Sequence, residues 1–116
     1  MGLDIKLLDT KNIQLYSDDS QKKLLADYGD VALQRCIGYY RGLHLAAFLG
    51  SNAIRVVNSF ETTQICGNKL LTTLALVRAR IPTPKTAISF TQDAALHSAE
   101  EMGYPVVHKP LVGSWG

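Results

Sequence analysis

The 116-residue sequence carries 12 lysine and arginine residues against 10 aspartate and glutamate residues, and 47% of its residues are hydrophobic. Chains that stay unfolded are poorer in apolar residues and less balanced in charge, so this composition predicts a folded globular protein. The net charge of +2 is spread along the chain rather than gathered in a basic run, which disfavours nucleic-acid binding.

Membrane insertion and export are also disfavoured. The longest mostly apolar stretch, residues 43–49, is far shorter than the roughly 20 residues that a membrane helix needs. Asp4 and Asp9 stand where a signal peptide has no acidic residues. We therefore expect a cytoplasmic protein.

The cysteines and histidines give no metal signature. Cys36 and Cys66 are far apart and form no Cys-x-x-Cys pair, which disfavours a zinc or redox site. Two buried thiols of a cytosolic protein are the expectation. The three histidines lack the spacing of metal ligands, so each is assigned a structural or solvent-exposed position.

Strand and helix patterns alternate in the first half of the chain. Residues 4–9 alternate weakly and predict a short strand, and the apolar run 31–37 predicts an interior strand that pairs with it. A helix is expected over 42–49, ending at Gly50, and a third strand over 54–57. This order predicts an α/β fold with a parallel sheet. Such a unit normally opens with an apolar strand and a helix, so the sequence is expected to begin one βα unit late.

Two helices are expected in the middle of the chain. Ser59 is a suitable N-cap for a helix over 60–65, with Glu61 in its first turn, and Gly67 breaks that helix. Asn68 is a suitable N-cap for a second helix, whose apolar residues recur at helical spacing.

The last third of the chain predicts two strands around a helix. The prolines at 82 and 84 favour an extended path into a strand over 85–90. Thr91 is expected to cap a helix that Gly103 ends, and residues 104–110 predict a final strand. The chain then stops inside a glycine-rich turn, where we expect a further strand to follow.

Two lysines stand out by their positions. Lys69 follows a helix cap, and Lys109 lies near the end of a predicted strand, before the glycine-rich turn. Amide donors of such a turn and an ammonium group together suit phosphate oxygens. A lone lysine is more often a solvated surface charge, so each lysine taken alone is weak evidence.

Several motifs in fixed order make the pattern more specific, and together they resemble the ATP-grasp superfamily. They are Cys66-Gly67-Asn68-Lys69, Pro82-Thr83-Pro84-Lys85-Thr86, Gly103-Tyr104-Pro105-Val106-Val107-His108-Lys109-Pro110 and Gly113-Ser114-Trp115-Gly116. Within the superfamily the last motif and the segment Arg35-Cys36-Ile37-Gly38-Tyr39-Tyr40-Arg41-Gly42 look most like the LysX family, which joins α-aminoadipate to a small acidic amino-group carrier protein in lysine biosynthesis.

The resemblance implies a carboxylate–amine ligase that uses ATP and Mg²⁺ and proceeds through an acyl phosphate. It implies that Lys69 and Lys109 contact the nucleotide phosphates and that a loop of four residues folds over them: Gly113, Ser114, Trp115 and Gly116. For Trp115, a lid side chain and a packing anchor both remain open. The implied magnesium ligands and adenine-contacting hinge are not in this sequence, so the piece alone is expected to be inactive, and the full-length protein to be a homo-oligomer.

A second candidate site is the segment 35–42, which follows a central strand at the edge where open α/β sheets bind ligands. Arg35 and Arg41 are predicted to bind the amino-acid substrate or a carboxylate of the carrier, because a guanidinium group pairs well with carboxylates. A surface or structural salt bridge is the alternative for either arginine. His108 departs from the family pattern, in which an apolar residue is expected.

The expected organisation is a partial N-terminal α/β domain over residues 1–59, a helical connector over 60–79, and the first part of an ATP-grasp nucleotide-binding domain over 80–116. Two other ligases remain alternatives: a RimK-like enzyme that adds glutamate to another acceptor, and a glutamate–carrier ligase of arginine biosynthesis. A non-catalytic α/β binding module is the third. The sequence has neither Gly-x-Gly-x-x-Gly nor a Walker motif, which disfavours the usual dinucleotide and P-loop versions of that module.

Overall fold

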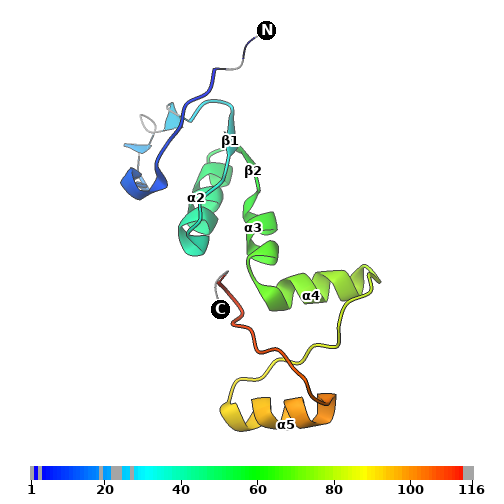
Figure 1. Ribbon diagram of the computed structural model, residues 1–116. Helices are drawn as coiled ribbons and strands as arrows, with labels where there is room; N and C mark the ends of the chain where they lie inside the picture. The colour runs from blue at the N-terminus through cyan, green and yellow to red at the C-terminus, as the bar shows by residue number, and fades with distance from the viewer. Residues whose placement is uncertain (1, 3, 19, 22–24, 27, 114–116) are drawn as a thin grey trace. The chain divides into compact units, whose positions relative to one another are not determined.

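The computed structural model describes residues 2, 4–18, 20–21, 25–26 and 28–113. In chain order it has a 3-10 helix, η1 (Thr10–Asn12), and then β1 (Val31–Leu33), α2 (Tyr39–Ser51), β2 (Arg55–Val57), α3 (Phe60–Cys66), α4 (Lys69–Arg78) and α5 (Gln92–Met102) (Figure 1). The chain divides into two compact units, residues 1–64 and 65–116. Within the described ranges no helix has the length and apolar character that crossing a membrane requires.

The first unit is built on a parallel pair of strands. β1 pairs with β2, with Ala32 opposite Val56, and α2 connects the two and packs against β2. The predicted α/β order of strand, helix and parallel strand is therefore confirmed. β1 is shorter than the predicted run 31–37, because its partner ends first. Asn58 leaves the strand conformation with a φ of 43° and instead donates its side-chain amide to the carbonyl of Gln34, at 3.0 Å.

Helix α2 carries the core of the first unit and is longer than predicted at both ends. Its buried hydrophobic side chains are Leu43, Leu45, Ala46 and Leu49. The prediction that Gly50 ends the helix is wrong, because a glycine inside a helix costs only about 1 kcal/mol. The helix ends at Ser51 instead, and the side-chain amide of its C-cap residue, Asn52, donates to the carbonyl of Phe48 at 2.8 Å.

The strand predicted over residues 4–9 is absent from that range, and among the described residues β1 pairs only with β2. Ile5 and Leu7 are 74% and 92% exposed, so their alternation buries no face. Alternation of apolar residues specifies a strand only when a neighbouring strand and a core accept it.

The predicted caps of the three shorter helices are confirmed. The hydroxyl of Ser59 accepts the amide of Thr62 at 3.2 Å at the start of α3. Asn68 caps α4, and Thr91 caps α5. Gly103 ends α5 in a conformation with a φ of 82°, which a residue with a side chain rarely adopts.

In the second unit the strands predicted over 85–90 and 104–110 are not formed. Both stretches lack a ladder partner among the described residues, and side chains such as Phe90 and Val107 are 86% and 79% exposed. Extended chain becomes a strand only through hydrogen bonds to a neighbour. Ala99 of α5 is the buried hydrophobic residue that the described part of this unit contains.

Candidate functional site

The first turn of α4 has all of its backbone amides satisfied by the protein. The side-chain oxygen of Asn68 accepts the amides of Leu70 and Leu71, at 3.0 and 3.2 Å. The amide of Lys69 donates to the carbonyl of Leu111 at 2.8 Å. A helix N-terminus binds anions through amides that lack such partners. At this helix, an anion would therefore have to be held by side chains.

The side chain of Lys69 lies on the segment that leads into the glycine-rich motif. Its Nζ donates to the carbonyl of Gly113 at 2.7 Å. Together with the bond from the Lys69 amide to Leu111, this makes a two-bond contact, which we call the Lys69 clasp. Gly113 has a φ of 121°, which favours glycine, and it leaves the carbonyl facing the ammonium group.

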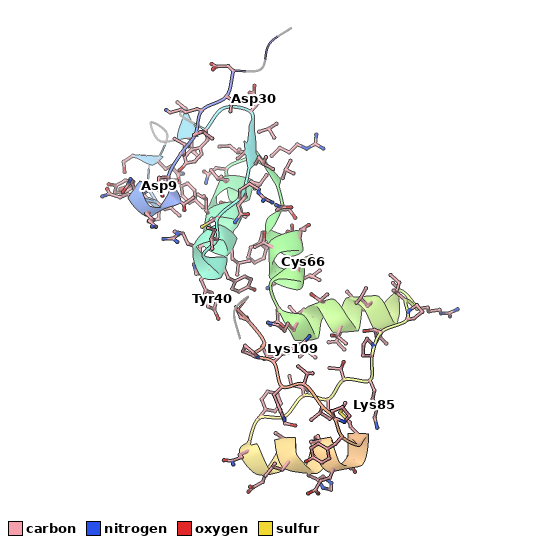
Figure 2. All side chains as sticks on the ribbon, viewed as in Figure 1. Asp9, Asp30, Tyr40, Cys66, Lys85 and Lys109 are labelled. Atoms are coloured by element: carbon pink, nitrogen blue, oxygen red, sulfur yellow. The ribbon has the colours of Figure 1, made fainter. Side chains whose placement is uncertain are left out.

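Lys109 is exposed and lies on the stretch that runs into the Lys69 clasp, as its label in Figure 2 shows. Among the described residues neither Lys69 nor Lys109 forms an ion pair with a carboxylate. The structure thus brings Lys69 together with Gly113, with Lys109 four positions before that glycine. Ser114, Trp115 and Gly116 lie outside the described residues.

This arrangement is chemically suited to an anion. An ammonium group whose described partner is an uncharged carbonyl can exchange that carbonyl for a phosphate oxygen, which adds attraction between opposite charges. A magnesium site is a different matter. No group of three or more His, Cys, Asp and Glu residues in the described ranges is placed to hold a metal ion, so no magnesium contact is assigned to these residues.

The second candidate site lies at the start of α2. Gly38 is the N-cap residue and supplies no side-chain hydrogen bond, and the first turn holds no acidic residue. The amides of Tyr39, Tyr40 and Arg41 have no acceptor in the described part of the chain. The N-terminus of a helix carries a partial positive charge, and the Arg41 guanidinium adds a full one. This end of α2 is electropositive.

The guanidinium of Arg41 is held in a folded-back position. Its Nε donates to Sγ of Cys36 at 3.4 Å. Its Nη2 lies 2.8 Å from the point where a Cβ on Gly38 would sit, so the group covers that glycine. Arg35 is exposed, and no described carboxylate pairs with either arginine.

The surroundings of Cys36 were not anticipated by the sequence. Its sulfur lies 3.3 Å from the hydroxyl of Thr10 as well as 3.4 Å from Nε of Arg41. Burial alone raises the pKa of the Cys36 thiol, but the hydrogen bonds with Thr10 and Arg41 and the Arg41 charge outweigh it and set the pKa below its usual value. The expectation of two buried thiols is wrong for Cys66, which is exposed, while Cys36 is half-buried.

The sequence does contain a signal for the contact between Cys36 and Arg41. A residue just after a strand and a residue in the first turn of the next helix face each other across a short connection, as Cys36 and Arg41 do here. Tyr40, labelled in Figure 2, adds an aromatic ring at the same end of α2. The ring is 62% exposed and lies edge-to-face with that of Tyr39, at a centroid distance of 5.0 Å.

Comparison with known proteins shows a family match over the first unit and several similar ligases. Residues 1–65 match the family model described as the LysX preATP-grasp domain. A glutamate–LysW ligase ArgX of Sulfolobus acidocaldarius is 44% identical over 94 residues, which is 81% of this chain and 33% of that protein. A second ArgX, from Sulfurisphaera tokodaii, is 39% identical over the same share of each.

A further relative covers the whole chain. An alpha-aminoadipate–LysW ligase LysX of Saccharolobus solfataricus is 34% identical over 116 residues, which is 100% of this chain and 41% of that protein. The chain thus spans between 33% and 41% of the length of these three relatives.

Proposed function

The chain belongs to the LysX preATP-grasp family, and from this premise we propose that it is part of an ATP-dependent ligase that joins an amino acid to the carrier protein LysW. The observation that carries the proposal is the family match over residues 1–65, together with relatives that are named LysW ligases of both the ArgX and the LysX type. The resemblance to the LysX family is thereby confirmed.

The domain organisation proposed for this ligase is that expected from the sequence. Residues 1–59 form a partial N-terminal domain, 60–79 a helical connector, and 80–116 the first part of a nucleotide-binding domain. The similarity of the LysX relative from Saccharolobus solfataricus along the entire chain supports a shared architecture beyond residue 65.

At the nucleotide end, we assign the phosphate contacts to Lys69 and Lys109 and the close backbone approach to Gly113. When bound, ATP supplies the phosphoryl group that activates a carboxylate for attack by an amine. Lys69 would exchange its bond to the Gly113 carbonyl for one to a phosphate oxygen, while its amide stays on Leu111. The contribution of these residues is to position and to neutralise charge.

In the first unit, we assign a substrate carboxylate to Arg41, with Arg35 as a second exposed cation. Support comes from the uncapped first turn of α2 and from the absence of a described carboxylate beside either arginine. The exposed ring of Tyr40 is suited to the rim of a surface that meets the carrier protein, because aromatic side chains are enriched at such interfaces.

For the amino acid, we propose α-aminoadipate. Similarity to LysX relatives extends over all 116 residues. Glutamate is the competing substrate, favoured by the higher identity of 44% to an ArgX over 94 residues.

The test is a ligation assay with the protein produced from its full coding sequence. The protein is incubated with MgATP, purified LysW and either α-aminoadipate or glutamate, and the mass of LysW is followed by mass spectrometry. A mass increase equal to one α-aminoadipate residue, dependent on ATP, is the expected result. An increase with glutamate alone overturns the choice of substrate, and no increase with either amino acid overturns the ligase proposal.

A further inference from the structure

The folded-back position of the Arg41 side chain depends on one hydrogen-bond acceptor. Among the described residues, the polar partner of the Arg41 guanidinium is Sγ of Cys36, which accepts a hydrogen bond from Nε at 3.4 Å. The Nη groups have no acceptor among the described residues. The Arg41 guanidinium is therefore anchored at Nε, while its two Nη groups remain available to a ligand.

Cys36 is itself fixed from two further sides. The Thr10 hydroxyl lies 3.3 Å from Sγ, and the carbonyl of Gly38 lies 3.5 Å from it. On the side of the helix, Cβ of Cys36 is 3.2 Å from the point where a side chain on Gly42 would begin. The sulfur is thus held between η1, the connection after β1 and the first turn of α2.

A guanidinium group binds a carboxylate best through two parallel N–H donors. One donor edge of the fork is Nη1 with Nη2, and the other is Nε with Nη2. Because Cys36 occupies Nε, the edge made by the two Nη groups is the one left for a ligand. A long, exposed arginine otherwise loses rotamer entropy when it binds.

We propose that Cys36 is a positioning residue for Arg41: its sulfur holds Nε, so that the two Nη groups are presented, already ordered, to the carboxylate of the amino acid or carrier. The inference rests on the proposed role of Arg41 in substrate binding. The lowered pKa of the Cys36 thiol agrees with it, since a thiolate is the stronger acceptor for a guanidinium donor.

A purely structural role for Cys36 would give a different result. It would make any change at Cys36 lower stability and activity in the same way, whatever residue stands at position 41. A positioning role makes the effect depend on the Nε donor, which lysine does not have. The two roles are therefore separated by a double-mutant cycle between Cys36→Ala and Arg41→Lys.

The first experiment measures the anchoring itself in the protein produced from its full coding sequence and labelled with ¹⁵N-arginine. The Nε–H signal of Arg41 should exchange slowly with solvent in the unaltered protein and in Cys36→Ser, which keeps an acceptor. It should exchange as fast as that of exposed Arg35 in Cys36→Ala. Cys66→Ser, which changes the exposed cysteine of the other unit, is the matched control and should leave the signal unchanged. Equal exchange in Cys36→Ala and the unaltered protein overturns the proposal.

The second experiment uses the ligation assay. Cys36→Ala should raise KM for the amino acid or for LysW about three- to tenfold, the value of one net hydrogen bond, with KM for ATP unchanged. Cys36→Ser should recover most of the loss, and Cys36→Ala should have no further effect in the Arg41→Lys background. Equal effects of Cys36→Ala in both backgrounds overturn the proposal.

The two ideas fail in distinguishable ways. If the protein ligates neither amino acid, the proposed function falls while the exchange measurement still decides whether Cys36 anchors Arg41. If it ligates but Arg41→Ala leaves both KM values unchanged, the substrate role of Arg41 and the inference built on it are overturned together, and the ligase proposal stands.

Discussion

Replacement of Lys69 by alanine tests the proposed nucleotide end most directly. Alanine is the best helix former, and the amide bond from position 69 to the Leu111 carbonyl does not need the lysine side chain. The variant should therefore keep α4 and half of the Lys69 clasp. What it loses is the ammonium group, which now donates to the Gly113 carbonyl at 2.7 Å.

The size of the effect follows from what the ammonium group exchanges on binding. One hydrogen bond, to Gly113, is given up for another, to a phosphate oxygen, so the net gain is mainly the attraction between the two charges. At about 4 Å that attraction is about 1 kcal/mol in water and about 4 kcal/mol at an effective dielectric constant of about 20. Lys69 is half-buried, so we take about 1–3 kcal/mol. The Kd for a triphosphate should then rise about 5- to 150-fold.

Isothermal titration calorimetry with a non-hydrolysable ATP analogue and with inorganic tripolyphosphate measures this change. Lys85→Ala is the matched control, because Lys85, labelled in Figure 2, is exposed, belongs to the same unit and forms no ion pair with a described residue. It should alter Kd less than about twofold, and the gap between the two variants should narrow at high salt, which screens exposed charges. Equal Kd values for Lys69→Ala and Lys85→Ala at low salt would refute the assignment.

Three further predictions concern the elements that place these side chains. Gly42→Ala should lower the free energy of unfolding by about 1–2 kcal/mol in a denaturant titration, because the new methyl group meets the Gln34 side chain and Cβ of Cys36 at 3.2 Å. Gly50→Ala in the same helix meets nothing within 4 Å and should raise the free energy of unfolding by about 0.5–1 kcal/mol. The opposite order of the two variants would contradict the packing described for α2. Asn68→Ala should cost about 0.5–2 kcal/mol by uncapping α4, and Asn68→Asp, which keeps the acceptor, should cost less; equal midpoints in thermal unfolding would count against the cap. In a Cys66→Ser background, alkylation of Cys36 by iodoacetamide should follow a pKa below 9.0, and Arg41→Ala should move it upward. Because the folded-state pKa is the lower one, the stability that this thiolate adds is fully present above pH 9.0 and is lost as the pH falls through the folded-state value; an unshifted alkylation profile would argue against the contact.

The features that the sequence predicted correctly are those decided by residues close together in the chain. Asn68 and Thr91 cap their helices through side-chain bonds to amides two or three residues later, so a short window of sequence contains all the necessary partners. Gly103 ends α5 for a similarly local reason, since its positive φ suits glycine. The segment 35–42, which also indicated the family, lies within the matched residues 1–65 and is likewise read from neighbouring residues alone.

The features that only the tertiary structure decided depend on partners distant in the chain. The stretches 4–9, 85–90 and 104–110 have strand-like patterns, yet none forms a strand, because a ladder needs a second chain segment at hydrogen-bonding distance. The bond from Lys69 to Gly113 joins residues 44 positions apart, and no local pattern contains both of them. The contact of Cys36 with Thr10, 26 positions away, likewise arises only when the connection after β1 and η1 are folded together, whereas the contact with Arg41, five positions away, is local.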